Sequence, residues 1–141
     1  MKRHPALAPL SRDHHHTLVV SRMLREAGVQ QAPAATERWR SLWQEREREH
    51  FRKEEEVLAP ALAAHPSGAP LRERMLAEHR QIRARSDALL SSPDPARQTA
   101  ALAALGELLR RHVRFEENEL FPLLEASLDA EQLEEIGRRL A

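Results

Sequence analysis

The chain has 141 residues, which is enough for one domain with a substantial core, and its 22 Lys and Arg residues balance 22 Asp and Glu residues. This neutral charge excludes a strong field for holding nucleic acid or an acidic membrane surface, so we expect neither as a partner. The sequence contains no cysteine, which excludes disulfides, thiolate nucleophiles and iron–sulfur clusters and leaves nitrogen and oxygen as metal ligands.

Hydropathy gives an expectation about location. Every apolar stretch falls well short of the roughly 20 residues that span a bilayer. Pro5 and Pro9 interrupt the start of the chain, where a signal peptide would need a continuous apolar region. We therefore expect a soluble, cytoplasmic protein.

Ala, Leu, Arg, Glu and Gln dominate the sequence, which predicts an all-α fold. Ser11, Thr36 and Asp94 are candidate caps for the first, second and fourth helices. With the turn residues between them, they predict helices at about residues 11–27, 36–64, 70–90, 94–127 and 130–140. Because the connections between the four long helices are short, we expect one domain over residues 1–141, an up-and-down antiparallel four-helix bundle with a short C-terminal fifth helix.

The second and fourth predicted helices carry the same motif, His-x-x-x-Glu. It occurs as His50 with Glu54 and as His112 with Glu116, and this spacing places both side chains of a pair on one helical face. The first and third helices repeat an acid followed by a histidine, in Asp13-His14 and Glu78-His79. The chain therefore consists of two related helical hairpins.

Apolar neighbours at helical spacing indicate which histidines face the core. His50, His79 and His112 each share a stripe with Leu, Ile, Val or Met residues. In the first helix three histidines are consecutive, and His14 shares its stripe with several leucines, so we choose His14, with His16 as the alternative.

Four histidines and two glutamates in an apolar core require compensation, because unpaired buried polar groups and charges are costly. A pair of metal ions supplies it, since it neutralises the carboxylates and is bound by neutral imidazole. Carboxylates on facing helices would bridge the ions, and the donor set suits iron, manganese or zinc. The candidate metal ligands are His14, His50, Glu54, His79, His112 and Glu116.

In this order of motifs the chain resembles the hemerythrin-like (HHE cation-binding) family, with His on the first and third helices and HxxxE on the second and fourth. The resemblance extends over nearly the whole chain, including the segments EEEVLAPAL and EENELFPLLE. It implies a left-handed four-helix bundle around two carboxylate-bridged iron ions. It also implies a role in binding O2, in sensing O2 or NO, in peroxide defence or in iron handling.

Oxygen-carrying members of the family use five histidine ligands, whereas this sequence offers four, so we do not expect stable oxygen carriage. We expect binding or sensing of a small ligand (O2, NO or peroxide) rather than turnover, and we assign no catalytic residue. The alternatives are a di-iron peroxidase or oxidase and a zinc-bound or metal-free helical interaction module. A ferritin-like oxidase is not favoured, because its ExxH motif occurs only once, at Glu47–His50.

Acidic residues beside the HxxxE motifs have two interpretations. Glu55, Glu56 and Glu117 are expected to form a solvated run of charges. Alternatively, they accept a proton from a ligand imidazole or add a ligand.

Overall fold

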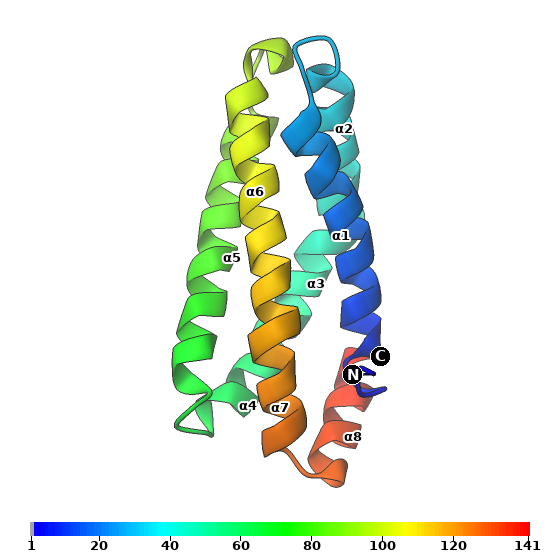
Figure 1. The fold of residues 1–141 in the computed structure, drawn as a ribbon, viewed down its shortest axis with the longest axis vertical. Helices are drawn as coiled ribbons and strands as arrows, with labels where there is room; N and C mark the ends of the chain where they lie inside the picture. The colour runs from blue at the N-terminus through cyan, green and yellow to red at the C-terminus, as the bar shows by residue number, and fades with distance from the viewer. Residues whose placement is uncertain (1) are drawn as a thin grey trace.

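The computed structural model describes residues 2–141, which form helices and turns without any strand. This confirms the predicted all-α class. The long helices lie beside one another along the length of the molecule, and α8 (Ala130–Leu140) packs near the start of the chain (Figure 1).

Helical segments join end to end into longer runs. After α1 (Ala8–Glu26), a continuous run extends from Ala32 to Ala63. It consists of α2 (Ala32–Leu42), η1 (Trp43–Glu47), α3 (Arg48–Lys53), η2 (Glu54–Leu58) and α4 (Ala59–Ala63). The next runs are α5 (Ala69–Leu90), a single 3-10 turn η3 (Pro95–Arg97), and α6 (Thr99–Phe115) continuing through η4 (Glu116–Leu120) into α7 (Phe121–Ser127).

Two helices begin earlier than the sequence led us to expect. The first begins at Ala8 rather than at residue 11, and the second at Ala32 rather than at residue 36. Each has a proline in its first turn, where the missing N–H costs no hydrogen bond. The expected cap Thr36 lies inside α2 and donates its hydroxyl to the carbonyl of Ala32, at 2.8 Å.

The fourth helix begins later than expected. Asp94 does not cap it; its carboxylate pairs with Arg97 at 3.1 Å, and the 3-10 turn η3 precedes the start of α6 at Thr99. The fifth helix spans the expected residues. Its capping box is complete, because Asp129 accepts from the Gln132 amide at 2.8 Å and Gln132 accepts from the Asp129 amide at 2.9 Å.

Three turns of the helical runs are π-helical: η1, η2 and η4. Both η2 and η4 begin at a predicted ligand, Glu54 or Glu116, and both precede a proline, Pro60 or Pro122. Since a proline ring clashes with the carbonyl four residues before it, a widened turn ahead of each proline keeps the run helical. Such turns occur often at functional sites.

The buried apolar residues form two separate clusters. One contains Trp39, Leu105 and their neighbours, and the other contains Leu58, Phe121 and their neighbours. On α1 the buried residue His14 lies between members of the two clusters, and His79 does the same on α5. A buried polar layer therefore separates two apolar layers.

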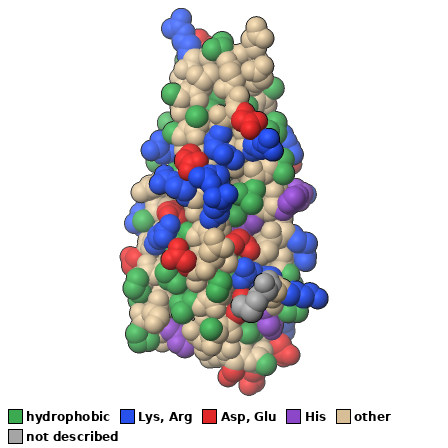
Figure 2. All heavy atoms as spheres, in the orientation of Figure 1, with side chains coloured by type: hydrophobic (Ala, Val, Ile, Leu, Met, Phe, Trp, Pro, Cys, Tyr) green, Lys and Arg blue, Asp and Glu red, His purple; other side chains and the backbone are tan. Residues whose placement is uncertain are grey.

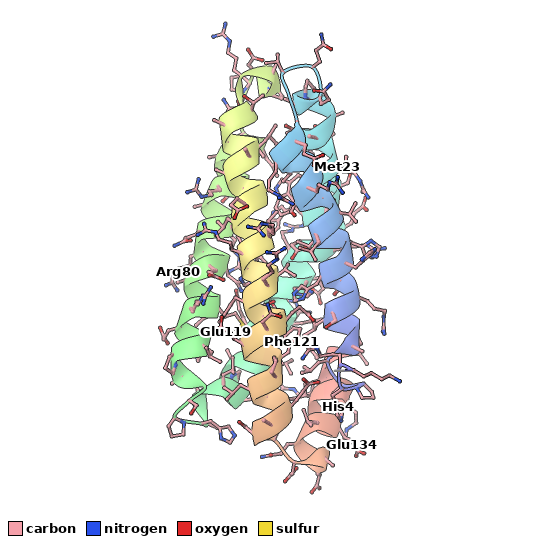
Figure 3. All side chains as sticks on the ribbon, viewed as in Figure 1. His4, Met23, Arg80, Glu119, Phe121 and Glu134 are labelled. Carbon is pink, nitrogen blue, oxygen red and sulfur yellow. The ribbon has the colours of Figure 1, made fainter. Side chains whose placement is uncertain are left out.

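On the visible face, basic, acidic and hydrophobic side chains are interspersed (Figure 2). Lys and Arg side chains gather over the middle of α6, where Arg110 and Arg111 both pair with Glu107. Met23 on α1, labelled in Figure 3, is one of a few exposed large apolar side chains. Within residues 2–141, every helix is too short or too polar to span a bilayer.

Candidate metal centre

The structure brings all six predicted ligands together in the polar layer. They form two groups, in each of which the nitrogen and oxygen atoms that could bind a metal lie within 4.8 Å of one another. One group is His14, His50, Glu54 and Glu116, and the other is Glu54, His79, His112 and Glu116. Because Glu54 and Glu116 belong to both, the groups are adjacent; we call them the His14/His50 subsite and the His79/His112 subsite.

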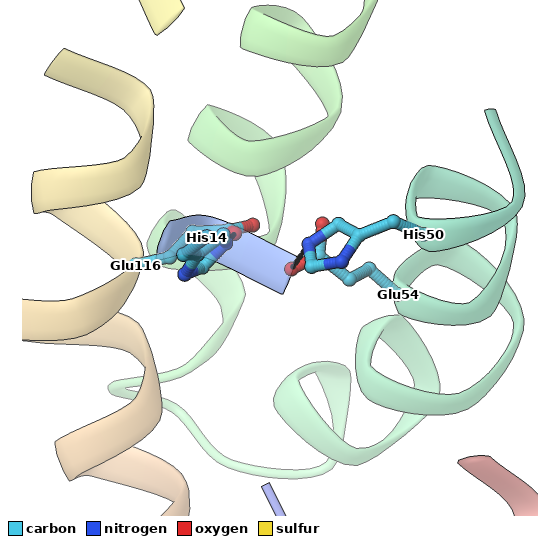
Figure 4. Close-up of side chains that lie close together, drawn as sticks. All are labelled: His14, His50, Glu54 and Glu116. Carbon is cyan, nitrogen blue, oxygen red and sulfur yellow. Dashed lines mark hydrogen bonds and ion pairs between the residues drawn. The ribbon is translucent and has the colours of Figure 1, made fainter. Parts of the chain in front are cut away.

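Four helical runs supply the six ligands: α1 and α5 give one histidine each, and the second and fourth runs each give a histidine and a glutamate. Figure 4 shows His50 and Glu54 reaching from one side of the space between the helices, and Glu116 from the opposite side. All six side chains are buried, with at most 2% of any residue exposed. His14 is the histidine of its run that faces inward, whereas His15 and the alternative candidate His16 are exposed.

Two imidazoles bond to the shared carboxylates through Nε2. His14 Nε2 lies 2.8 Å from Glu116 Oε1, and His79 Nε2 lies 3.1 Å from Glu54 Oε1. The other two are close but not hydrogen-bonded: His50 Nε2 is 3.2 Å from Glu54 Oε2, and His112 Nε2 is 3.3 Å from Glu116 Oε2.

These last four atoms are buried without a hydrogen-bond partner. Unsatisfied buried polar atoms are rare because each costs the full desolvation of the group. Two unpaired imidazole nitrogens and two unpaired carboxylate oxygens, all facing one space, form a donor set that fits two metal ions bound through nitrogen and oxygen.

A second carboxylate binds the outer nitrogen, Nδ1, of every candidate histidine ligand. The Nδ1 to carboxylate oxygen distances are 2.6 Å for His14 with Glu117, 3.0 Å for His50 with Asp13, 2.6 Å for His79 with Glu55, and 2.7 Å for His112 with Glu78. An imidazole that donates from Nδ1 presents Nε2 to the centre in a fixed orientation, as metal-binding histidines commonly do.

These four contacts form a closed ring around the bundle. Asp13 on α1 bonds to His50 on the second run, and Glu55 on the second run bonds to His79 on α5. Glu78 on α5 bonds to His112 on the fourth run, and Glu117 on the fourth run bonds to His14 on α1. Each run therefore contributes one ligand histidine and the acid that orients the histidine of the next run.

The expectation of a solvated run of charges is wrong for two of its three acids. Glu55 and Glu117 do not belong to a solvated run, because they bond to His79 and His14; Glu56 does, with its side chain 57% exposed. Asp13 and Glu78 had been noted only as part of a repeat. The available signal was that all four occur at matching offsets in the two hairpins.

Arginines pair with three of these acids, and phenylalanine rings stack on two of the histidines. Arg3 lies 3.2 Å from Glu117, Arg74 lies 3.0 Å from Glu78, and Arg83 lies 2.7 Å from Glu55. Phe51 stacks on His79 with ring centroids 3.9 Å apart and planes 6° apart. Phe121, at the start of α7 (Figure 3), stacks on His14 at 5.5 Å.

Without metal, the centre is a network of ion pairs. Burial would lower the pKa of His14, but its hydrogen bonds with Glu116 and Glu117 outweigh burial and raise the pKa to about 9. For His112, burial is likewise outweighed by the charge of Glu116 and by hydrogen bonds, which raise the pKa to about 10. The pKa values of His50 and His79 are also raised.

The pKa values of the carboxylates shift in the opposite direction. Burial opposes the ionised form of Glu55, but His79 and Arg83 lower its pKa to about 2, and His112 holds the pKa of Glu116 well below its usual range. In this state protons on the imidazoles balance the buried carboxylates. A metal ion would replace these protons, because it binds the neutral imidazole.

Comparison with known proteins is consistent with this geometry. The family model for the hemerythrin HHE cation binding domain matches residues 6–124, a range that includes all six residues of the two subsites. No match was found among curated proteins or among solved structures. The chain belongs to the hemerythrin HHE cation-binding domain family.

Proposed function

We propose that this protein binds two iron ions, one in each subsite, bridged by Glu54 and Glu116, and uses them to bind or sense a small ligand such as O2, NO or peroxide. The observation that carries the proposal is the pair of four-residue groups that share these two buried carboxylates. The four unpaired buried atoms of His50, His112, Glu54 and Glu116 support it further.

The protein's own residues would prepare the site in three ways. The acids on Nδ1 fix the orientation of each imidazole and accept a hydrogen bond from the proton that remains on Nδ1 when Nε2 is deprotonated. Glu54 and Glu116 offer one oxygen to each side of the centre. The apolar clusters on either side keep bulk water away.

An iron pair held in this way supplies redox chemistry and an open coordination position for a small ligand. Manganese or zinc would fit the same nitrogen and oxygen donors. We propose iron because the family comparison indicates a cation-binding domain and the donor set lacks the sulfur that would favour a softer metal.

We also propose that residues 1–141 form a single domain in which the four long runs pack as an up-and-down antiparallel bundle. The order of colours in Figure 1 supports this arrangement, because successive runs pass along the molecule in alternating directions. A bundle of this kind lets each of four helices place ligands at the same level of the core.

Elemental analysis of protein expressed with iron, together with its absorption spectrum with and without azide, tests the proposal. We expect about two iron ions per chain, matching the two subsites, and a near-ultraviolet band that azide shifts by entering an open position. Less than one iron per chain in protein loaded anaerobically would contradict it.

The same measurements separate the alternatives. Two zinc ions with no visible absorption would support a structural module. Steady peroxide turnover by the iron-loaded protein, abolished in Glu116→Gln and retained in the exposed-site control Glu119→Gln, would support an enzyme instead of a sensor.

A further inference from the structure

Two buried polar side chains, Glu47 and Thr17, are close in sequence to His50 and His14 and bond to each other. Glu47, at the end of η1, is 3% exposed, and Thr17, on α1, is 1% exposed. The Thr17 hydroxyl lies 2.7 Å from Glu47 Oε2, to which it donates. Within residues 2–141, Glu47 takes part in no ion pair with Lys, Arg or His at 4.0 Å or less.

Only one subsite has such a pair. Glu47 precedes His50 by three residues and Thr17 follows His14 by three residues. At the equivalent positions of the second hairpin lie Leu109 and Ile82, which are fully buried and belong to the apolar core. The repeat that duplicated the ligands therefore did not duplicate this pair.

The backbone also differs at Glu47. The π-helical turns η2 and η4 correspond to each other, but η1, which ends at Glu47, has no counterpart on the fourth run, where α6 is regular from Thr99 to Phe115. A π-helical turn changes the register of the residues on one side of it relative to the other, is rare, and occurs frequently at functional sites. This irregular turn directly precedes the segment that carries His50.

Negative charge accumulates on the His14/His50 side. Glu47 lies on the same helical run as His50 and Glu54, and its carboxylate is buried. Among residues 2–141, Asp13 bonds to His50 but forms no ion pair with an arginine, unlike the three other acids that hold Nδ1 atoms. Within the described part of the chain, Glu47 is the buried carboxylate without an ion-pair partner, and burying such a charge costs free energy that a nearby metal ion would offset.

A surface hollow lies between the same two helices. It has a volume of about 210 Å³ and is lined by His16 on α1 and by Arg38, Leu42, Glu45 and Arg46 on the second run. His16 and Arg46 are the direct neighbours in sequence of Thr17 and Glu47.

We propose that Glu47, held in place by Thr17, makes the His14/His50 subsite bind metal more tightly than the His79/His112 subsite, so that the two ions bind in a fixed order. This inference rests on the proposed two-metal centre. Glu47 adds no seventh ligand: its negative charge, three residues before His50 on the same run, favours a cation in this subsite, while the six ligands remain those already described.

A titration of the metal-free protein with Co²⁺ tests the order, because the absorption of Co²⁺ in the visible range reports its ligands. We expect two steps whose affinities differ by about tenfold or more. His79→Ala should retain the tight step alone, and His14→Ala should retain the weak step alone. Glu47→Gln should weaken the tight step by about 10–100-fold and leave the weak step unchanged.

The double variant Thr17→Ile/Glu47→Leu gives the first subsite the apolar neighbours of the second, and its two steps should merge. Glu49→Gln is the matched control, because Glu49 lies on the same run and is exposed, and its titration should equal that of the unmodified protein. Circular dichroism of each variant verifies the helical content. Two equal steps in the unmodified protein, or an unchanged titration in Glu47→Gln, would overturn the proposed order; an unmodified protein that binds no Co²⁺ would overturn the two-metal centre as well.

Discussion

The two subsites have matching ligands but different surroundings. Each receives two histidines and a share of Glu54 and Glu116, and each histidine is oriented by an acid from a neighbouring run. Yet His79 is stacked closely on Phe51, whereas the His14/His50 side has the polar pair of Thr17 and Glu47. The comparison teaches that the internal repeat determines which atoms meet at the centre, while residues outside the repeat determine how alike the halves are.

Replacing a shared carboxylate should have the largest effect on metal content, because Glu54 and Glu116 belong to both subsites. We expect Glu116→Gln to reduce the metal content from about two ions per chain to less than one, since Gln neither bridges nor neutralises two cations. Metal analysis after gel filtration measures this. Glu119→Gln, at an exposed position of η4, is the control. Retention of two ions in Glu116→Gln would refute the shared-bridge arrangement.

Replacing a single histidine ligand should remove the metal ion from one subsite only. We expect His14→Ala and His79→Ala each to retain about one ion per chain, because each removes a ligand from one group only. His15→Ala, which alters the exposed neighbour of His14, should retain both ions. If either buried variant lost both ions, or if His15→Ala lost one, the assignment of ligands to the two subsites would be wrong.

Removing one of the four acids that bond to Nδ1 atoms should have a smaller effect on metal binding, limited to one subsite. Glu55→Gln removes the carboxylate that holds His79 Nδ1 at 2.6 Å and should weaken binding at the His79/His112 subsite by about 10–100-fold. Glu56→Gln changes the adjacent exposed acid and should change nothing. Competition with a chelator of known affinity measures both, and equal affinities in the two variants would exclude an orienting role for Glu55.

Raising the pH of the metal-free protein should have the smallest effect, a loss of thermal stability. The pKa of His14 is raised to about 9 and that of His112 to about 10, so their stabilising contribution is complete below about pH 6.5 and is lost as the pH rises through these values. We expect Tm to fall by on the order of 5 °C or more between pH 6.5 and 10. Metal-loaded protein should not show this loss, because its imidazoles are already neutral; a Tm that rises over this range without metal would contradict the ion-pair network.

Much of this centre was predictable from sequence. The six candidate ligands follow from helical spacing and apolar neighbours, because each judgement concerns one helix face at a time. His14 was distinguishable from His15 and His16 for the same reason, and the burial of His14 agrees with that choice. The all-α class follows from composition alone.

The rest depends on geometry between helices. The contact of Asp13 with His50 joins residues from different runs, and no single-helix pattern reveals it. The single ExxH motif at Glu47–His50 counted only against a ferritin-like oxidase, yet the irregular turn η1, which no spacing rule anticipates, ends at the buried residue Glu47. Helix starts were misplaced where a proline in the first turn was a better signal than a Ser or Thr three or four residues later.

Anomalous X-ray diffraction from crystals of the iron-loaded protein, collected at the iron absorption edge, tests the two-metal centre most directly. We predict two anomalous peaks roughly 3.5–4 Å apart. One should be bound by His14 and His50, the other by His79 and His112, and both should contact Glu54 and Glu116. A single peak, or peaks only at exposed histidines such as His15 and His16, would contradict this account.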